Sequence, residues 1–138
     1  MYPQHLTQPM KEDLTSVGFS DITSADQVVE LLKKQGTTLL VVNSVCGCAA
    51  GAARPGVKLA LKKSAKKPDH LATVFAGVDA EAVQKARQFL APYPPSSPSI
   101  AIFKDGELIH FVERHHIEGR SADMIAAHLE EAFKEFCN

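Results

Sequence analysis

A continuous run of β-branched and aliphatic residues, Thr-Thr-Leu-Leu-Val-Val-Asn at positions 37–43, limits the possible folds of this chain more than any other segment. The run lacks the polar–apolar alternation of a strand that faces water on one side, and it is typical of a strand buried on both faces. Such strands lie at the centre of sheets that helices cover on both sides. We therefore expect residues 37–43 to form a central parallel strand.

Helical and strand patterns alternate along the rest of the chain. Ser24 and Gln27 predict a capping box at the start of one helix, Asp79 is expected to cap another, and Pro55 should kink a third. These patterns predict a single α/β domain over residues 1–138, with a central four-stranded mixed sheet flanked by helices and an extra N-terminal helical segment. The expected helices are residues 9–17, 25–35, 49–67, 80–90 and 122–136, and the expected strands are 37–43, 71–77, 99–103 and 107–112.

Composition and charge argue against several classes of function. With 15 basic and 16 acidic residues the formal net charge is −1, so no overall charge favours nucleic acid or an anionic membrane. The first seven residues lack the basic and apolar regions of a secretion signal, and no apolar stretch is long enough to cross a bilayer. The sequence therefore predicts a cytoplasmic protein that binds neither nucleic acid nor membrane.

Two of the three cysteines, Cys46 and Cys48, follow the predicted central strand and precede an alanine-rich helix. Unpaired N–H groups at a helix start stabilise a thiolate, so Cys46, at the expected N-cap, is the predicted nucleophile. Residues two apart in a helix point roughly 200° apart around its axis. A disulfide between Cys46 and Cys48 would therefore need a distorted backbone, which Gly47 permits, and strain would make that bond easy to reduce.

The spacing of these cysteines has three interpretations when it is taken by itself. An odd cysteine count, with two cysteines one residue apart, argues against a structural disulfide framework. Redox chemistry, a metal-binding clip, and a pair of small buried residues at a helix start remain open at this point.

The residues around the pair resemble the bacilliredoxin family. The similar segments are residues 41–55 (VVNSVCGCAAGAARP), 73–77 (TVFAG), 95–99 (PSSPS) and 114–119 (RHHIEG), so the resemblance covers nearly the whole chain. It implies a thioredoxin-like fold and action on mixed disulfides between proteins and bacillithiol, a low-molecular-weight thiol. Cys46 would take over the bacillithiol and Cys48 would resolve or assist, with that thiol as co-substrate and no cofactor. Unlike ordinary thioredoxins, the chain has Cys-x-Cys, no tryptophan, and Leu40 where they carry a buried acid.

Two further segments are expected to face the cysteines. Thioredoxin-like folds place a cis-proline opposite the active cysteine, and Pro98 is predicted to fill this role and to expose the backbone of Ser97 for pairing with substrate. Because the terminal hairpin returns to the same edge of the sheet, Arg114, His115 and His116 should also lie there. A cationic Arg114 or His115 could stabilise the thiolate or bind a carboxylate of the small thiol, although an ordinary hydrogen-bonded turn is the alternative.

Three functions follow from these residues. The first is removal of bacillithiol from protein mixed disulfides, and the second is disulfide isomerisation, which is also attributed to the family. The third is a metal carrier that uses Cys46, Cys48 and His115 as soft ligands. For the redox functions the partners would be bacillithiolated or disulfide-containing proteins and a low-molecular-weight thiol. Cys137 would be a third exchanging thiol or, as we expect, a frayed and exposed tail thiol.

Overall fold

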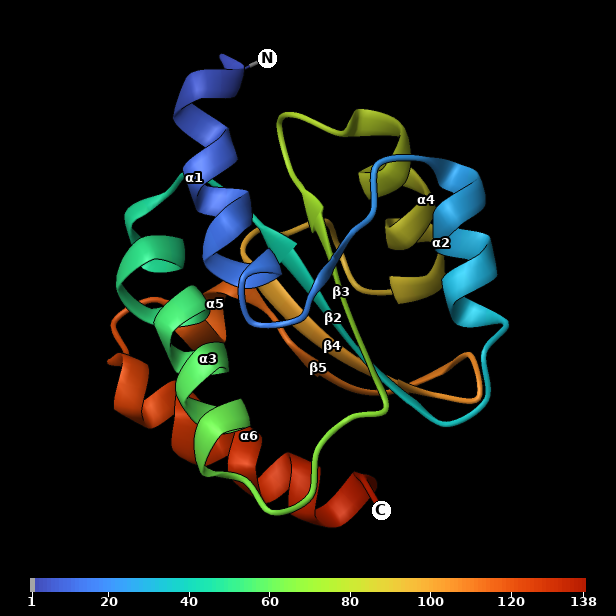
Figure 1. The fold of residues 1–138 in the computed structure, drawn as a ribbon, viewed down its shortest axis with the longest axis vertical. Coiled ribbons are helices and arrows are strands. Elements are labelled where there is room, and N and C mark those ends of the chain that lie inside the picture. The colour runs from blue at the N-terminus through green and yellow to red at the C-terminus, as the bar shows by residue number, and fades with distance from the viewer. Residues whose placement is uncertain (1) are drawn as a thin grey trace.

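The computed structural model describes residues 2–138, which form one five-stranded sheet with helices on both faces (Figure 1). β1, β3 and β2 are parallel neighbours, whereas β4 is antiparallel to both β2 and β5. The predicted α/β fold with a mixed sheet is confirmed. The strands are β1 (Ser20–Asp21), β2 (Thr37–Asn43), β3 (His70–Phe75), β4 (Ser99–Lys104) and β5 (Glu107–Val112), and their order across the sheet is β1-β3-β2-β4-β5.

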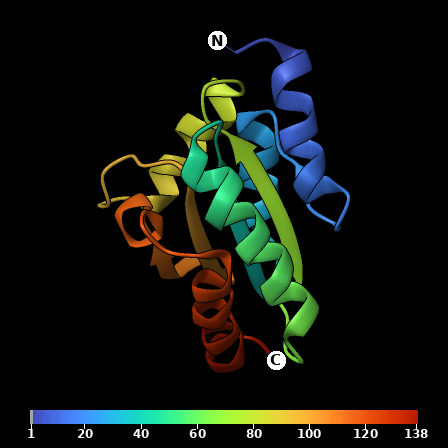
Figure 2. The same ribbon diagram turned by 90° about the vertical axis from the view of Figure 1, so that its left-hand side faces the viewer.

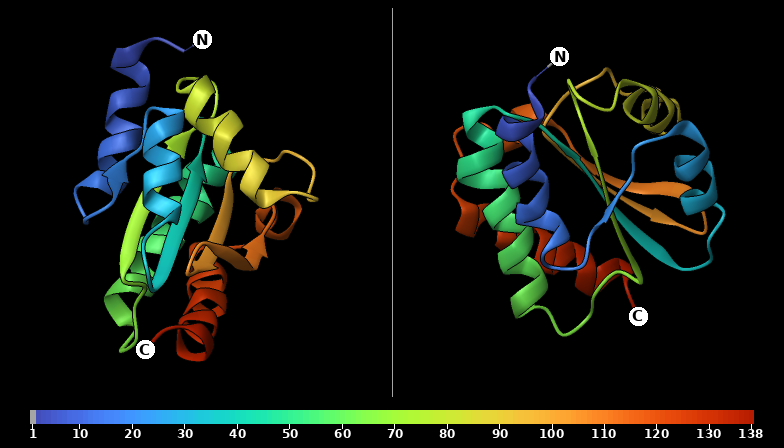
Figure 3. Two further views of the ribbon diagram at one scale, coloured as in Figure 1. Left: turned by 90° about the vertical axis from the view of Figure 1, so that its right-hand side faces the viewer. Right: turned by 45° about the horizontal axis from the view of Figure 1, so that its top comes forward.

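The helices form two layers. One face of the sheet is covered by α1, α3 and α6 (Figure 2), and the other by α2 and α4 (Figure 3). None of the helices within residues 2–138 is long and apolar enough to span a membrane. The helices are α1 (Gln4–Thr15), α2 (Ala25–Leu32), α3 (Arg54–Lys63), α4 (Ala80–Leu90), α5 (Arg114–Ile117) and α6 (Ala122–Phe136), and a π-helical segment η1 (Ala49–Ala53) leads into α3.

Strand β2 lies at the centre of the sheet, as predicted, and all seven of its residues are buried. Leu39 and Val41 belong to the core that packs against α3 and α6, whereas Leu40 and Val42 belong to the core on the side of α2 and α4. Apolar residues are therefore required on both sides of the strand, which explains the continuous run. Asn43 ends the strand immediately before the segment that carries the cysteines.

The four-stranded prediction was wrong by one strand. β1 contains only the polar residues Ser20 and Asp21, which is too short a segment for any periodicity to indicate a strand. It forms nevertheless because the flanking Phe19 and Ile22 are buried and hold the backbone beside β3. The strand that was expected over residues 71–77 ends at Phe75.

Three helix predictions also need correction. The N-terminal helix begins at Gln4 instead of residue 9. Asp79 makes no capping hydrogen bond, because its carboxylate lies 2.7 Å from the buried Nζ of Lys11. Pro55 does not lie in the middle of a long α-helix, because the preceding turn is π-helical and the proline occupies the first turn of α3. The predicted capping box of Ser24 is confirmed.

Gly56 sets the distance between α3 and α6. A Cβ atom at this position would lie 2.7 Å from Cβ and Cγ2 of Ile125. We expect Gly56→Ala to lower the free energy of unfolding by about 1–3 kcal/mol, because the helices must move apart. Gly51→Ala is the matched control, since a Cβ there meets no atom within 4 Å. Thermal unfolding of the two variants measures the difference, and equal melting temperatures would contradict the close packing.

Candidate active site

Cys46 lies three residues beyond the end of β2, at the start of the helical segment. Its carbonyl oxygen accepts hydrogen bonds from the N–H groups of Ala49 and Ala50, at 3.1 and 3.2 Å. Its side chain is half-buried, with Sγ 3.4 Å from the Ser44 hydroxyl and 2.7 Å from Sγ of Cys48. The helix-start position that the sequence predicts for Cys46 is confirmed.

The two sulfur atoms lie side by side, contrary to the expected divergence. The estimate of roughly 200° holds for two residues inside one regular helix. Cys46 precedes the first helical residue, Gly47, so its backbone does not follow the helical rotation. A Cβ at Gly47 would meet no atom within 4 Å, and its φ does not lie in the left-handed region, so the contact does not depend on a special glycine conformation. A sulfur–sulfur contact therefore exists while all three cysteines are free thiols.

The surroundings of the two thiols shift their pKa values in opposite directions. Burial alone would raise the pKa of Cys46, but hydrogen bonds from the Cys48 thiol, the Ser44 hydroxyl and the N–H groups of Ala49 and Cys48 outweigh it and lower that pKa. The pKa of Cys48 is raised by burial, by the proton that it shares with Cys46 and by the negative charge of Cys46, with Arg114 acting in the opposite direction. The shifts therefore favour ionisation of Cys46 before Cys48.

The Ser44 hydroxyl donates one of the hydrogen bonds that lower the pKa of Cys46. Because the pKa of Cys46 is lowered, its thiolate persists at a pH where a free cysteine is protonated, and alkylation should rise with pH through a midpoint below that of free cysteine. We expect Ser44→Ala to move this midpoint upward and to slow alkylation near neutral pH about three- to fivefold, the equivalent of one hydrogen bond. The pH dependence of iodoacetamide labelling measures it, and an unchanged midpoint would contradict the role of Ser44.

A buried arginine fixes the turn that precedes the cysteines. Arg54 Nη1 donates to Oδ1 of Asn43 and to the carbonyl oxygen of Ser44, both at 2.9 Å, and its Nε lies 3.3 Å from the Asp13 carboxylate. Asn43 in turn donates to the carbonyl oxygen of Met10 at 3.1 Å. Sequence reasoning missed this network. The available signal was a single arginine in an otherwise small and apolar helical stretch.

The Ser97–Pro98 peptide bond is cis, as predicted, and the neighbouring Ser97 lines the same cavity as Cys46. The expectation that the Ser97 backbone is open to substrate was only partly right. The carbonyl oxygen of Ser97 accepts a hydrogen bond from Arg114 Nη1 at 3.1 Å. Arg114 also donates its backbone N–H to the Ser96 hydroxyl at 3.5 Å, so the first residue of α5 is held against this loop, and a substrate would have to pair with the Ser97 N–H.

A cavity of about 200 Å³ opens beside Cys46. Arg114 and Ser97 line it, as predicted, and the charge of Arg114 acts on both cysteines. Tyr2 also lines the cavity, which the sequence did not indicate. Its ring packs on Gly77 so closely that a Cβ there would lie 2.6 Å from Tyr2 Cε2. The lining of the cavity therefore combines the Cys46 thiol with a cation and an aromatic ring.

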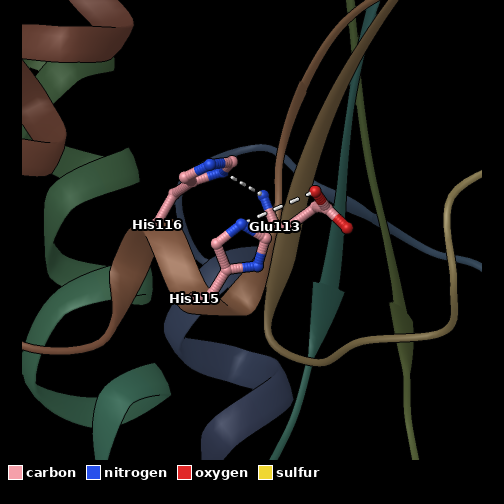
Figure 4. Close-up of side chains that lie close together, drawn as sticks. All are labelled: Glu113, His115 and His116. Carbon is pink, nitrogen blue, oxygen red and sulfur yellow. Dashed lines mark hydrogen bonds and ion pairs between the residues drawn. The ribbon is translucent and has the colours of Figure 1, made fainter.

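His115 and His116 do not reach the cysteines. His115 is 67% exposed and its Nε2 lies 3.8 Å from the Glu113 carboxylate, while Nδ1 of His116 accepts the Glu113 N–H at 3.3 Å (Figure 4). No hydrogen bond or ion pair within residues 2–138 joins His115 to either sulfur. The expected metal-ligand set of Cys46, Cys48 and His115 is therefore not assembled. In the described chain, the ligand atoms that converge are those of Glu113, His115 and His116.

Neither interpretation of Cys137 holds. It is only 4% exposed and packs in the core below α3 and α6. Burial raises the pKa of its thiol, and its hydrogen-bond partner Thr37 begins β2, whereas Cys46 follows the other end of that strand. Phe136, the last residue of α6, packs against the same core, so the packing of this helix buries the cysteine that follows it. Cys137 can be neither a frayed tail thiol nor a partner of the active pair.

Comparisons with known proteins identify the family and the fold of this chain. Residues 2–137 match the family model described as disulphide isomerase. The chain is 62% identical to a bacilliredoxin of Cytophaga hutchinsonii over 98% of its length and 99% of the relative, and 47% identical to a bacilliredoxin of Bacillus cereus over 99% and 95%. The solution structure of oxidised thioredoxin from Plasmodium falciparum superposes with a TM-score of 0.60 at 14% identity, covering 88% of this chain and 100% of that one. The chain therefore belongs to the bacilliredoxin family of thioredoxin-fold thiol-disulfide oxidoreductases.

Proposed function

We propose that this protein removes bacillithiol, or a closely related small thiol, from protein mixed disulfides. The observation that carries the proposal is the pair of adjacent thiols with opposite pKa shifts, Cys46 lowered and Cys48 raised. The names of the relatives support the choice of bacillithiol. We place the reaction in the cytoplasm, with bacillithiolated proteins as partners and without a cofactor.

In the first step, the Cys46 thiolate attacks the bacillithiol sulfur of the mixed disulfide. The bond between that sulfur and the protein sulfur breaks, a new disulfide forms between Cys46 and bacillithiol, and the protein leaves as a thiolate that takes a proton from water. The cavity beside Cys46 supplies binding groups for the small thiol. Arg114 is a cation suited to a carboxylate, and Tyr2 offers a ring face and a hydroxyl.

In the second step, Cys48 attacks Cys46. Burial raises the pKa of Cys48, and while Cys46 is a thiolate the shared proton and the negative charge of Cys46 raise it further. The two causes that come from Cys46 disappear once Cys46 is in a disulfide, and the charge of Arg114 then favours ionisation of Cys48. Its thiolate displaces bacillithiol and forms a Cys46–Cys48 disulfide, which two electrons from an external thiol reductant return to the dithiol form.

Intact mass spectrometry with acid trapping tests the transfer. Wild type, Cys46→Ala, Cys48→Ala and Cys137→Ala are incubated with a bacillithiolated model protein. We expect a bacillithiol adduct to accumulate on Cys48→Ala, no adduct on Cys46→Ala, and wild-type behaviour for Cys137→Ala. An adduct on Cys46→Ala would show that Cys46 is not the nucleophile.

Disulfide isomerisation is the second candidate, favoured by the description of the matching family model. An isomerase attacks protein disulfides directly, so it needs no small thiol. If no variant gains a bacillithiol adduct while the wild type restores activity to a scrambled protein, isomerisation replaces the first proposal.

A further inference from the structure

A second cavity, of about 260 Å³, lies between β5, α5 and α6. Four basic side chains line it, namely those of His110, His116, Arg120 and His128, together with apolar side chains that include Ile125. No residue lines both this cavity and the one beside Cys46. The proposed redox reaction therefore leaves this cluster of basic groups without a role.

His110 and His128 are hydrogen-bonded to each other. Nε2 of His110 lies 2.8 Å from Nε2 of His128, and the rings are inclined by 25° with their centres 5.0 Å apart. Since each Nε2 faces the other, one of them donates a proton and the other accepts it. The pair therefore holds a single proton between the rings, and one further proton would make it a cation with N–H groups on its outer nitrogens.

The polar side chains that line the cavity around this pair are basic. Burial lowers the pKa of His128, and the nearby Arg120 and His116 lower it further. Burial and the charge of His128 lower the pKa of His110, against which Glu135 acts. Within residues 2–138, no carboxylate lines the cavity. The basic groups thus repel one another, and an anion among them would relieve that repulsion.

We infer that this cavity is a binding site for a small oxyanion, of the class of phosphate or a phosphate monoester. Arg120 lines the cavity and is exposed, and within residues 2–138 it hydrogen-bonds only through its backbone N–H, to the carbonyl oxygen of Ile117, so its guanidinium donors are available. His116 uses Nδ1 to accept the Glu113 N–H, which leaves Nε2 for a ligand. The apolar wall at Ile125 would accommodate the organic part of a monoester.

A metal ion fits this cavity less well. Within the described chain, one group of at least three ligand atoms converges, that of Glu113, His115 and His116, and it includes neither His110 nor His128. A divalent cation would also be repelled by Arg120, and no carboxylate in the lining would compensate for that charge. An anion would instead be attracted by every basic group in the lining.

Binding should be coupled to proton uptake. An anion favours the protonated form of the histidines and raises their pKa values, so binding is tighter as the pH falls from about 7 to about 6. The groups that act on the pair are Arg120, His116 and Glu135. Two carboxylates oppose the basic groups, because Glu135 acts on His110 and the Glu113 carboxylate lies within 4.8 Å of the ligand nitrogens of His115 and His116. A bound anion still favours the protonated histidines, so the coupling is positive.

To test this, the reduced protein is titrated at about pH 6 with inorganic phosphate and, separately, with phenyl phosphate. Binding is monitored through the imidazole NMR signals. We expect saturable shifts of the His110 and His128 signals. Arg120→Gln and His128→Gln should each weaken binding about tenfold or more. Lys134→Gln is the matched control, because it removes a positive charge from another face of α6 and should leave the affinity unchanged.

The two probes distinguish the sources of the anion. Tighter binding of phenyl phosphate supports a phosphate monoester, whereas equal affinities support free phosphate. Shifts that never saturate, or an affinity that Arg120→Gln leaves intact, would overturn the inference. So would saturable binding of zinc by the same histidines without a response to phosphate. None of these outcomes depends on the reaction of Cys46, since every readout is a histidine signal.

Discussion

Replacing Cys46 with serine is expected to reduce the rate of bacillithiol removal by about a thousandfold or more. A serine hydroxyl is not ionised at neutral pH, so the hydrogen bonds that stabilise the Cys46 thiolate have no anion to act on. Cys48→Ser should behave differently. Its hydroxyl can still donate to Cys46, so the first transfer should remain and stop after one bacillithiol per protein molecule. Single-turnover kinetics with a bacillithiolated substrate separate the two cases.

Cys137→Ser is the control for general effects of cysteine loss. Its thiol is buried at the other end of the central strand, so the rate of the first transfer should not change. A Cys46→Ser variant that keeps more than about a tenth of the wild-type rate would show that another group performs the attack.

Replacing Arg54 with methionine is expected to lower the free energy of unfolding by about 3 kcal/mol. The change leaves the buried carbonyl oxygen of Ser44 and the side chain of Asn43 without their shared donor. Asp13 is about one-third exposed and water can hydrate it, so its loss of a partner adds little. For a domain of this size, a change of this magnitude corresponds to a fall in melting temperature of about 10 °C.

Lys58→Met is the matched control for Arg54. Lys58 contacts the same Asp13 carboxylate at 2.6 Å but is itself about one-third exposed and does not touch the turn at Ser44. We expect it to cost about 1 kcal/mol or less. Arg54→Met should also disturb the pH profile of Cys46 alkylation, whereas Lys58→Met should not. Equal losses of stability for the two variants would show that Arg54 acts only through its ion pair with Asp13.

The local features of this protein could be predicted from its sequence because they depend on neighbouring residues. The unbroken apolar run at 37–43 indicated a strand covered on both faces, and the β4–β5 hairpin followed from a Lys-Asp-Gly turn between apolar runs. The position of Cys46 at a helix start required only the order of strand and helix. The expected thioredoxin-like fold added the cis bond at Pro98, and the return of the terminal hairpin added Arg114, which lines the cavity beside Cys46.

Tertiary structure decided the remaining features, because they join segments that are distant in the sequence. Asp13 and Arg54 meet only when α1 packs beside α3, and Tyr2 reaches the cavity of Cys46 only because Gly77 leaves room for its ring. The failure at His115 has the same origin. The end of β5 placed the right segment at the sheet edge, but the turn into α5 directs successive side chains to different sides. Sequence periodicity defines which residues share a face of one element, whereas packing between elements determines which faces meet.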